Sequence, residues 1–553
     1  MGSRSFAWGW PRKSATTTCE SKVREAAATG TLVDLRVSES AIDSPEKGTE
    51  WGPERTVRAE LIADLLIGDG EAASLAVRGV RLRGARITGD LNLEAATLRC
   101  PLALLDCSFA TAINLYEATA LSVRLSGSHV PAVHARQLRT RGDLRLDEGF
   151  SVSGRVEVDG AHIGGVLDCR GGQFSNPGGR ALTAVGLTVD QDIFFSEGFS
   201  ASGEVNLRGA HIGGQLNCAG GQFSNPNRVA LTAEMVTVDR DIICRNGFSA
   251  SGEVRLLGAH IGGQLDCAGG QFSNPGGRAL TADGLTVDQD TLCSDGFSAT
   301  GEVRLPSAHI GGQLVCEGGQ FSNPNRVALN LAGATVSGPL FMAPAVLQGL
   351  LGLTTAKTSS YRDDPASWPQ KLRLDGFVYD AIEGASAKER LEWLRRNEKG
   401  YSPQIYEQLA TVYRATGHEE DARRILIAKQ RRRFAQSNLA GRMWGWLLDA
   451  TVGYGYRTWL AALWLIFFLF LGTWLFGSVY RGELTPANKP DVQPAFQPLL
   501  YTLDLLLPVV SLHVRDAWIA HSAAQVWSVV FIIMGWILAT AVVLSLTGLL
   551  KRD

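Results

Sequence analysis

The chain has 553 residues, with 53 Lys and Arg against 55 Asp and Glu, and 62 glycines. A net charge of −2 argues against a dedicated nucleic-acid binder, which would carry a basic stripe, so no nucleic-acid partner is expected. The first residues show no continuous apolar segment of the secretory kind, and the nine cysteines do not have disulfide-like spacing. We therefore expect most of the chain to lie in a reducing compartment with free thiols.

Two short regions precede the repetitive part of the chain. Residues 1–50 mix Ser, Thr, Ala and charged residues without periodicity, which predicts a mobile tail. Residues 51–73 contain the segment Glu54–Ile67 (ERTVRAELIADLLI), whose apolar residues recur at helical spacing. A helix in this place would cover the open end of a solenoid, so we interpret residues 51–73 as a helical cap.

A 49-residue unit is repeated four times in residues 149–344. Each copy opens with Gly-Phe-Ser and continues through Ala-His-Ile-Gly-Gly, Leu-x-Cys and Gly-Gly-Gln-Phe-Ser-Asn-Pro. A fixed period of this size marks stacked repeats, whereas a β-sandwich does not predict it. Short alternating strands with glycine corners predict a mainly β protein with a parallel β-helix over residues 74–344. It would have about eleven coils at ~4.8 Å each, roughly 50 Å in total. Residues 345–385 are expected to be a linker with closing strands.

Residues 386–440 change to helical patterning. The segment from Tyr401 to Arg433 resembles one tetratricopeptide-type helical hairpin. A single unit cannot form the groove that stacked repeats create, which favours a structural adaptor over a partner-binding platform.

Residues 441–553 are predicted to be a membrane domain. The apolar runs 459–479 and 526–550 are each long enough to span a bilayer. Basic residues precede the first run, with Lys429–Arg433 as the main cluster, and Lys551 and Arg552 follow the second. The positive-inside rule then predicts a multi-pass protein of the cell membrane with both termini cytoplasmic.

The segment 499–512 between the spans is apolar but short, which predicts a re-entrant or interfacial segment. It carries Asp504, and a carboxylate in such surroundings is costly unless it is hydrated or paired. Asp504 is therefore a candidate functional residue of the membrane domain, with simple exposure at the interface as the alternative. Thr451–Gly455 spells the potassium-filter sequence, but it precedes the first span, so a juxtamembrane turn is expected.

One histidine recurs in every copy of the repeat, between Ala and Ile-Gly-Gly: His162, His211, His260 and His309. A row of imidazoles along a rod is a candidate interaction surface that protonation would alter. The alternative is a corner residue that was copied with its repeat.

The repeated cysteines Cys169, Cys218, Cys267 and Cys316 take inward positions of the strand alternation and are interpreted as core. Equivalent residues two coils apart lie ~10 Å from each other, too far to share a zinc ion. The repeated Asp-x-Asp pairs are expected to be turn residues. No catalytic residue, cofactor site or metal site is predicted.

Three segments carry a resemblance to a known group of proteins: Tyr406–Ala410 (YEQLA), Tyr413–Glu419 (YRATGHE) and Trp446–Arg457 (WLLDATVGYGYR). They resemble bacterial predicted membrane proteins that combine an N-terminal β-helix, of the pentapeptide-like or bactofilin-like kind, with two C-terminal transmembrane helices. Members are often labelled membrane-associated oxidoreductases, and the resemblance implies that activity as an alternative function.

The leading hypothesis is a non-enzymatic scaffold or interaction protein, anchored in the bilayer on the cytosolic face of the bacterial inner membrane. Its β-helix would bind an unknown protein partner or a second copy of the chain. The alternatives are a membrane-associated oxidoreductase, and a channel-like protein with a degenerate pore segment and a regulatory solenoid.

Overall fold

The computed structural model describes residues 18–37, 43–67, 78–457, 459–487, 495–507 and 510–546. These residues form two compact units. The first comprises the chain up to Ser386 together with Arg396–Glu398, and the second comprises Ala387–Arg395 and the chain from Lys399 onward.

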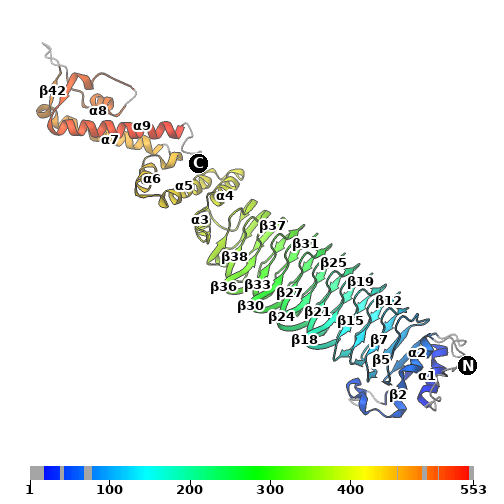
Figure 1. Ribbon diagram of the computed structural model, residues 1–553. Helices are drawn as coiled ribbons and strands as arrows, with labels where there is room; N and C mark the ends of the chain where they lie inside the picture. The colour runs from blue at the N-terminus through cyan, green and yellow to red at the C-terminus, as the bar shows by residue number, and fades with distance from the viewer. Residues whose placement is uncertain are drawn as a thin grey trace, which may run out of the picture. The chain divides into compact units, whose positions relative to one another are not determined.

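The first unit is a parallel β-solenoid of about 13 turns (Figure 1). Within the described residues its strands form one parallel sheet of 24 strands and another of 17. Most strands have only two residues, such as β16 (His162–Ile163) and β17 (Leu167–Asp168), because glycines and small residues turn the chain at each corner. The predicted fold class is therefore confirmed.

Each 49-residue repeat supplies two coils of unequal length. His162 pairs with Thr188, and Thr188 pairs with His211, so the coils contain 26 and 23 residues. The longer coil contains an eleven-residue strand whose pairing register shifts at the Asn-Pro turn. These strands are β18 (Gln173–Thr183), β24 (Gln222–Thr232), β30 (Gln271–Thr281) and β36 (Gln320–Asn330). The side-chain amide of Asn176 closes the first turn by donating to the carbonyl oxygen of Arg180 at 2.8 Å.

The strands that pair with these long strands belong to the shorter coils: β21 (Ser200–Asn206), β27 (Ser249–Arg255) and β33 (Ser298–Arg304). Glycine is required where the two kinds of coil approach closely. Gly252 has φ of +128°, and a Cβ atom there would lie 2.6 Å from the carbonyl oxygen of Asn225. A larger residue at this position would push neighbouring coils apart.

A column of phenylalanine rings fills one side of the interior. The rings come alternately from Gly-Phe-Ser and from Gln-Phe-Ser, and neighbouring centroids lie 5.1–5.7 Å apart from Phe150 to Phe321. All of these rings are buried. The repeat therefore places one ring in every coil at the spacing of parallel strands.

The N-terminal part of the solenoid begins earlier than the sequence indicated. Residues expected in a mobile tail form α1 (Thr18–Thr29) and β1 (Val33–Asp34), and β1 pairs with β3 (Val80–Arg83). The predicted cap helix is split, since its first residues form β2 (Thr56–Arg58), paired with β4 (Arg86–Thr88), and α2 covers only Ala59–Ile67. Pairing with a free sheet edge outweighs local helical spacing there. Residues 1–17 and 68–77 lie outside the described residues.

The solenoid also continues beyond residue 344. Residues 345–385, expected to form a linker with closing strands, instead continue the coils in parallel pairs: β38 (Val346–Gly352), β39 (Lys357–Asp363), β40 (Lys371–Arg373) and β41 (Val378–Glu383). Buried rings of Tyr361, Phe377 and Tyr379 fill these coils. The 49-residue pattern is absent here, so periodicity could not reveal these coils. These additional coils help make the solenoid longer than the eleven or so coils that the sequence predicted.

The second unit begins with helices. These are α3 (Ala387–Arg395), α4 (Pro403–Ala415), α5 (Glu419–Ala435) and α6 (Leu439–Val452). Helices α4 and α5 form the hairpin, with Leu409, Ala410 and Ala422 buried between them. The Thr-Val-Gly-Tyr-Gly sequence ends α6 in a turn, where Gly453, Tyr454 and Gly455 all have positive φ.

Among the residues that the structure describes, two helices are long and apolar enough to cross a membrane: α7 (Trp459–Glu483) and α9 (Ser522–Leu546). They lie side by side, and a two-stranded ribbon of β42 (Leu484–Pro486) and β43 (Trp518–Ala520) joins them at one end (Figure 1). Helix α8 (Pro498–Leu506) packs against both. Residues 547–550, the expected end of the second span, lie outside the described residues.

Candidate functional site

The four repeated histidines form a row on the outside of the solenoid. They open the strands β16, β22 (His211–Ile212), β28 (His260–Ile261) and β34 (His309–Ile310). The isoleucine that follows each one is at most 1% exposed, so alternation directs the imidazole outward. His162, His211 and His260 have side chains that are 45–50% exposed. The row therefore faces solvent.

Threonines separate the histidines in the same row. Thr188, Thr237, Thr286 and Thr335 take the equivalent place in the intervening coils. Arg139 precedes His162 and Lys357 follows Thr335, so basic residues stand at both ends. At ~4.8 Å per coil the histidines recur every ~10 Å.

Aspartates from the repeated Asp-x-Asp pairs face the first three histidines. The Nε2 atom of His162 lies 2.9 Å from the carboxylate of Asp190, and the corresponding distances are 3.9 Å for His211–Asp239 and 3.7 Å for His260–Asp288. Ser337 stands at the fourth equivalent position. These pairs are about half exposed, so they contribute little to stability.

The second aspartate of each pair has a different role. The carboxylates of Asp192, Asp241 and Asp290 accept hydrogen bonds of 2.8–2.9 Å from backbone N–H groups of Gln215, Gln264 and Gln313 in the following coil. These aspartates are turn residues, as the sequence indicated. In each Asp-x-Asp pair, the first aspartate therefore belongs to the exposed row and the second stabilises a turn.

The repeated cysteines lie inside the solenoid in a column that the sequence revealed only in part. Strand pairing aligns Cys218 with Cys244, Cys244 with Cys267, Cys267 with Cys293, and Cys293 with Cys316. Cys244 and Cys293 were missed because they lie outside the Leu-x-Cys motif. The distance of 26 residues from Cys218 to Cys244, one long coil, was the available signal.

Five consecutive coils therefore place a thiol at one interior position. All five are at most 4% exposed, and burial raises the pKa of the Cys316 thiol. The same position holds Phe195 in the coil between Cys169 and Cys218. Within the ranges that the structure describes, no three His, Cys, Asp or Glu side chains are grouped so as to hold a metal ion.

Asp504 lies on α8 and is only 4% exposed. Its carboxylate accepts hydrogen bonds of 2.8 Å from the backbone N–H groups of Leu512 and Arg515. Asp504 is therefore buried and not exposed at an interface. Its two hydrogen bonds hold the segment after α8 against that helix. Whether Asp504 has a further role stays a prediction.

No protein-family model, curated protein or solved structure matches the chain. The resemblance to bacterial membrane proteins thus stays a prediction.

Proposed function

We propose that this protein is a membrane-anchored scaffold on the cytosolic face of the bacterial inner membrane, and that the His–Thr row of its solenoid binds an elongated or repetitive partner. The observation that carries the proposal is the row itself, which presents four solvent-facing histidines at ~10 Å intervals, three of them paired with an aspartate, without a role in the core. A partner with a similar spacing would gain from several weak contacts at once. A second copy of the chain is one such partner.

The anchor in this proposal is the α7–α9 hairpin. Several of its large apolar side chains are exposed, including Phe470 at 71%, Trp474 at 70% and Trp536 at 56%. A helix pair in water would bury such side chains, whereas lipid accommodates them. Ala461, near the start of α7, and Ala541, near the end of α9, belong to the same apolar cluster. This supports a topology in which the start of α7 and the end of α9 lie on the same side of the membrane.

The partner test uses full-length protein purified from native membranes, with its co-purifying proteins quantified. One variant replaces the four histidines with Ala. Its matched control replaces four exposed glutamines at another face of the same repeats: Gln173, Gln222, Gln271 and Gln320. We expect one protein, or additional copies of the chain, to be lost from the histidine variant and kept in the control. Equal recovery in both variants would refute the role of the row.

The orientation test uses introduced cysteines, because all nine native cysteines are buried. Gln173→Cys places a thiol on the solenoid, and Thr485→Cys places one on the exposed ribbon between α7 and α9. We expect an impermeant maleimide to label position 173 only in inverted vesicles and position 485 only in spheroplasts. Labelling of both positions from the same side would contradict the hairpin topology.

A further inference from the structure

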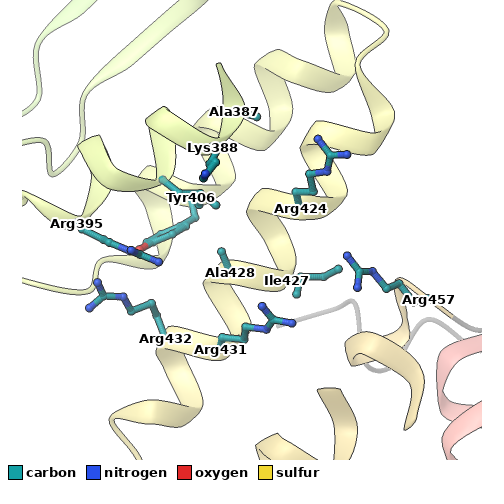
Figure 2. A pocket seen from close by; sticks show the side chains of 11 residues that line it. Ala387, Lys388, Arg395, Tyr406, Arg424, Ile427, Ala428, Arg431, Arg432 and Arg457 are labelled. Atoms are coloured by element: carbon teal, nitrogen blue, oxygen red, sulfur yellow. The ribbon is translucent and has the colours of Figure 1, made fainter. Parts of the chain in front are cut away.

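A basic pocket lies in the second unit, between α3, α5 and the segment just before α7 (Figure 2). Its volume is about 450 Å³. Six of its eleven lining residues are Lys or Arg, and Asp and Glu are absent from the described residues that line it. The six are Lys388, Arg395, Arg424, Arg431, Arg432 and Arg457.

Two of these cations are already compensated. Arg431 forms an ion pair of 2.9 Å with Asp449, and Arg424 forms one of 2.9 Å with Asp421. For the other four, Lys388, Arg395, Arg432 and Arg457, the described part of the chain supplies no carboxylate within 4 Å. All four residues are exposed, so their mutual repulsion is screened by water, but a bound anion would still be attracted by all of them.

Tyr406 adds a neutral hydrogen-bond donor to this wall. The residue is 3% exposed, and its side chain lines the pocket. Figure 2 shows the tyrosine next to Arg395, with Arg432 below. Burial raises the pKa of Tyr406, although the charges of Arg432 and Arg395 oppose this, so the hydroxyl keeps its proton at neutral pH. Because the Tyr406 side chain lines the pocket, its hydroxyl can donate to a bound ligand.

The pocket adjoins the region where the chain would enter a membrane. Arg457 lies two residues before the start of α7. Helix α6, which ends at Val452, exposes Leu439 (75%), Met443 (67%) and Trp446 (73%). Exposed apolar side chains with tryptophan next to a span are typical of a helix at the membrane interface. Phosphate groups of lipids are concentrated at that level.

We propose that this pocket binds a phosphate-bearing anion, either the headgroup of an anionic phospholipid or a soluble phosphate compound. Arg395 and Arg432 would bind the phosphate oxygens with their guanidinium N–H groups, since arginine matches phosphate geometry. Tyr406 would donate its hydroxyl proton to a third oxygen. The lipid source depends on the membrane anchor of the proposed function, whereas the soluble source does not.

The experiment measures ligand retention by the full chain in nanodiscs. One set contains phosphatidylcholine alone, and the other contains phosphatidylcholine with one-fifth phosphatidylglycerol. Native mass spectrometry counts the retained phosphatidylglycerol, and titration with pyrophosphate in the neutral nanodiscs tests the soluble source. Retained lipid identifies the headgroup, and pyrophosphate binding without retained lipid identifies a soluble ligand. Binding in neither arm would overturn the proposal.

The pocket variant combines Arg395→Gln, Arg432→Gln and Arg457→Gln, and should weaken binding at least about tenfold, since each basic group near an anionic surface contributes several-fold. The matched control removes three exposed arginines of the same unit outside the pocket: Arg414, Arg423 and Arg442, each to Gln. Equal weakening by both variants would mean diffuse attraction and refute a built site.

Two further measurements keep the result interpretable. Tyr406→Phe keeps the ring and all charges, and should weaken binding a few-fold with an unchanged melting temperature. In neutral nanodiscs the pocket variant should melt at the same or a higher temperature than the native chain, because it removes repulsion between neighbouring arginines. A lower melting temperature would mean that these arginines stabilise the fold. Partner recovery by the histidine row is scored separately, so failure of one proposal does not decide the other.

Discussion

The phenylalanine column predicts a local and measurable weakness when one ring is removed. Phe248 is fully buried, and its ring lies 5.5 Å from that of Phe223 and 5.1 Å from that of Phe272. Truncation of a core Phe to Ala costs about 3–5 kcal/mol, and ring pairs of this kind add about 0.5–1.5 kcal/mol each. The two costs count partly the same contacts and are not added. We therefore expect Phe248→Ala to lower the free energy of local unfolding by about 4 kcal/mol, which raises the equilibrium constant for local opening roughly 10³-fold.

Hydrogen exchange with mass spectrometry on the full chain measures this loss strand by strand. Each coil of a solenoid contacts only its neighbours, so the effect should be confined to β24, β27 and β30. Amides of β38 and β39, several coils away, should keep their protection. Phe248→Leu is the matched control, because it keeps most of the apolar volume and should cost less than about 1.5 kcal/mol.

Two outcomes would refute this reasoning. Equal effects of the Leu and Ala variants would mean that ring volume at position 248 does not stabilise the column. Uniform acceleration along the whole solenoid would mean that its coils unfold as one cooperative unit rather than as neighbours.

The remaining predictions concern thiols, the helix hairpin and acid stability. The native cysteines should react with iodoacetamide only after denaturation, because they are buried; rapid native labelling would contradict this. Gly472→Leu should lower the melting temperature in detergent, since its Cβ would clash with the side chain of Thr502. Gly477→Leu should not, because that position has room for a Cβ. Burial opposes ionisation of Asp168, but hydrogen bonds and the charge of Arg170 hold the pKa of its carboxyl below the usual range of an aspartate. Its stabilisation is therefore fully present above the usual aspartate pKa and is lost as the pH falls through the lowered pKa. Arg170→Gln should weaken this dependence, measured by hydrogen exchange, while the backbone hydrogen bond from residue 170 remains.

The solenoid was predictable from the sequence because an unvarying period constrains the fold more than any single motif. The two different coil lengths could not be predicted from the sequence. The Asn-Pro turn adds residues to one coil of each repeat, but the apolar alternation before the turn is unchanged and gives no sign of it. Strand β1 and the coils after residue 344 carry no copy of the repeat, and their pairing is decided by contacts between distant residues. The basic pocket was also beyond sequence analysis, because Arg395 and Arg457 are 62 positions apart.

The inside and the outside of the repeat differ in what each position requires. The interior column holds Cys169, then Phe195 in the next coil, and thiols in the five coils that follow Phe195, so this position requires apolar volume and not sulfur chemistry. The outer row has no packing requirement of that kind, since its imidazoles are about half exposed and their ion pairs with aspartate are weak. Removing the histidines should therefore leave the fold intact, which makes the row the part of the repeat where a change in binding can be measured without a change in stability.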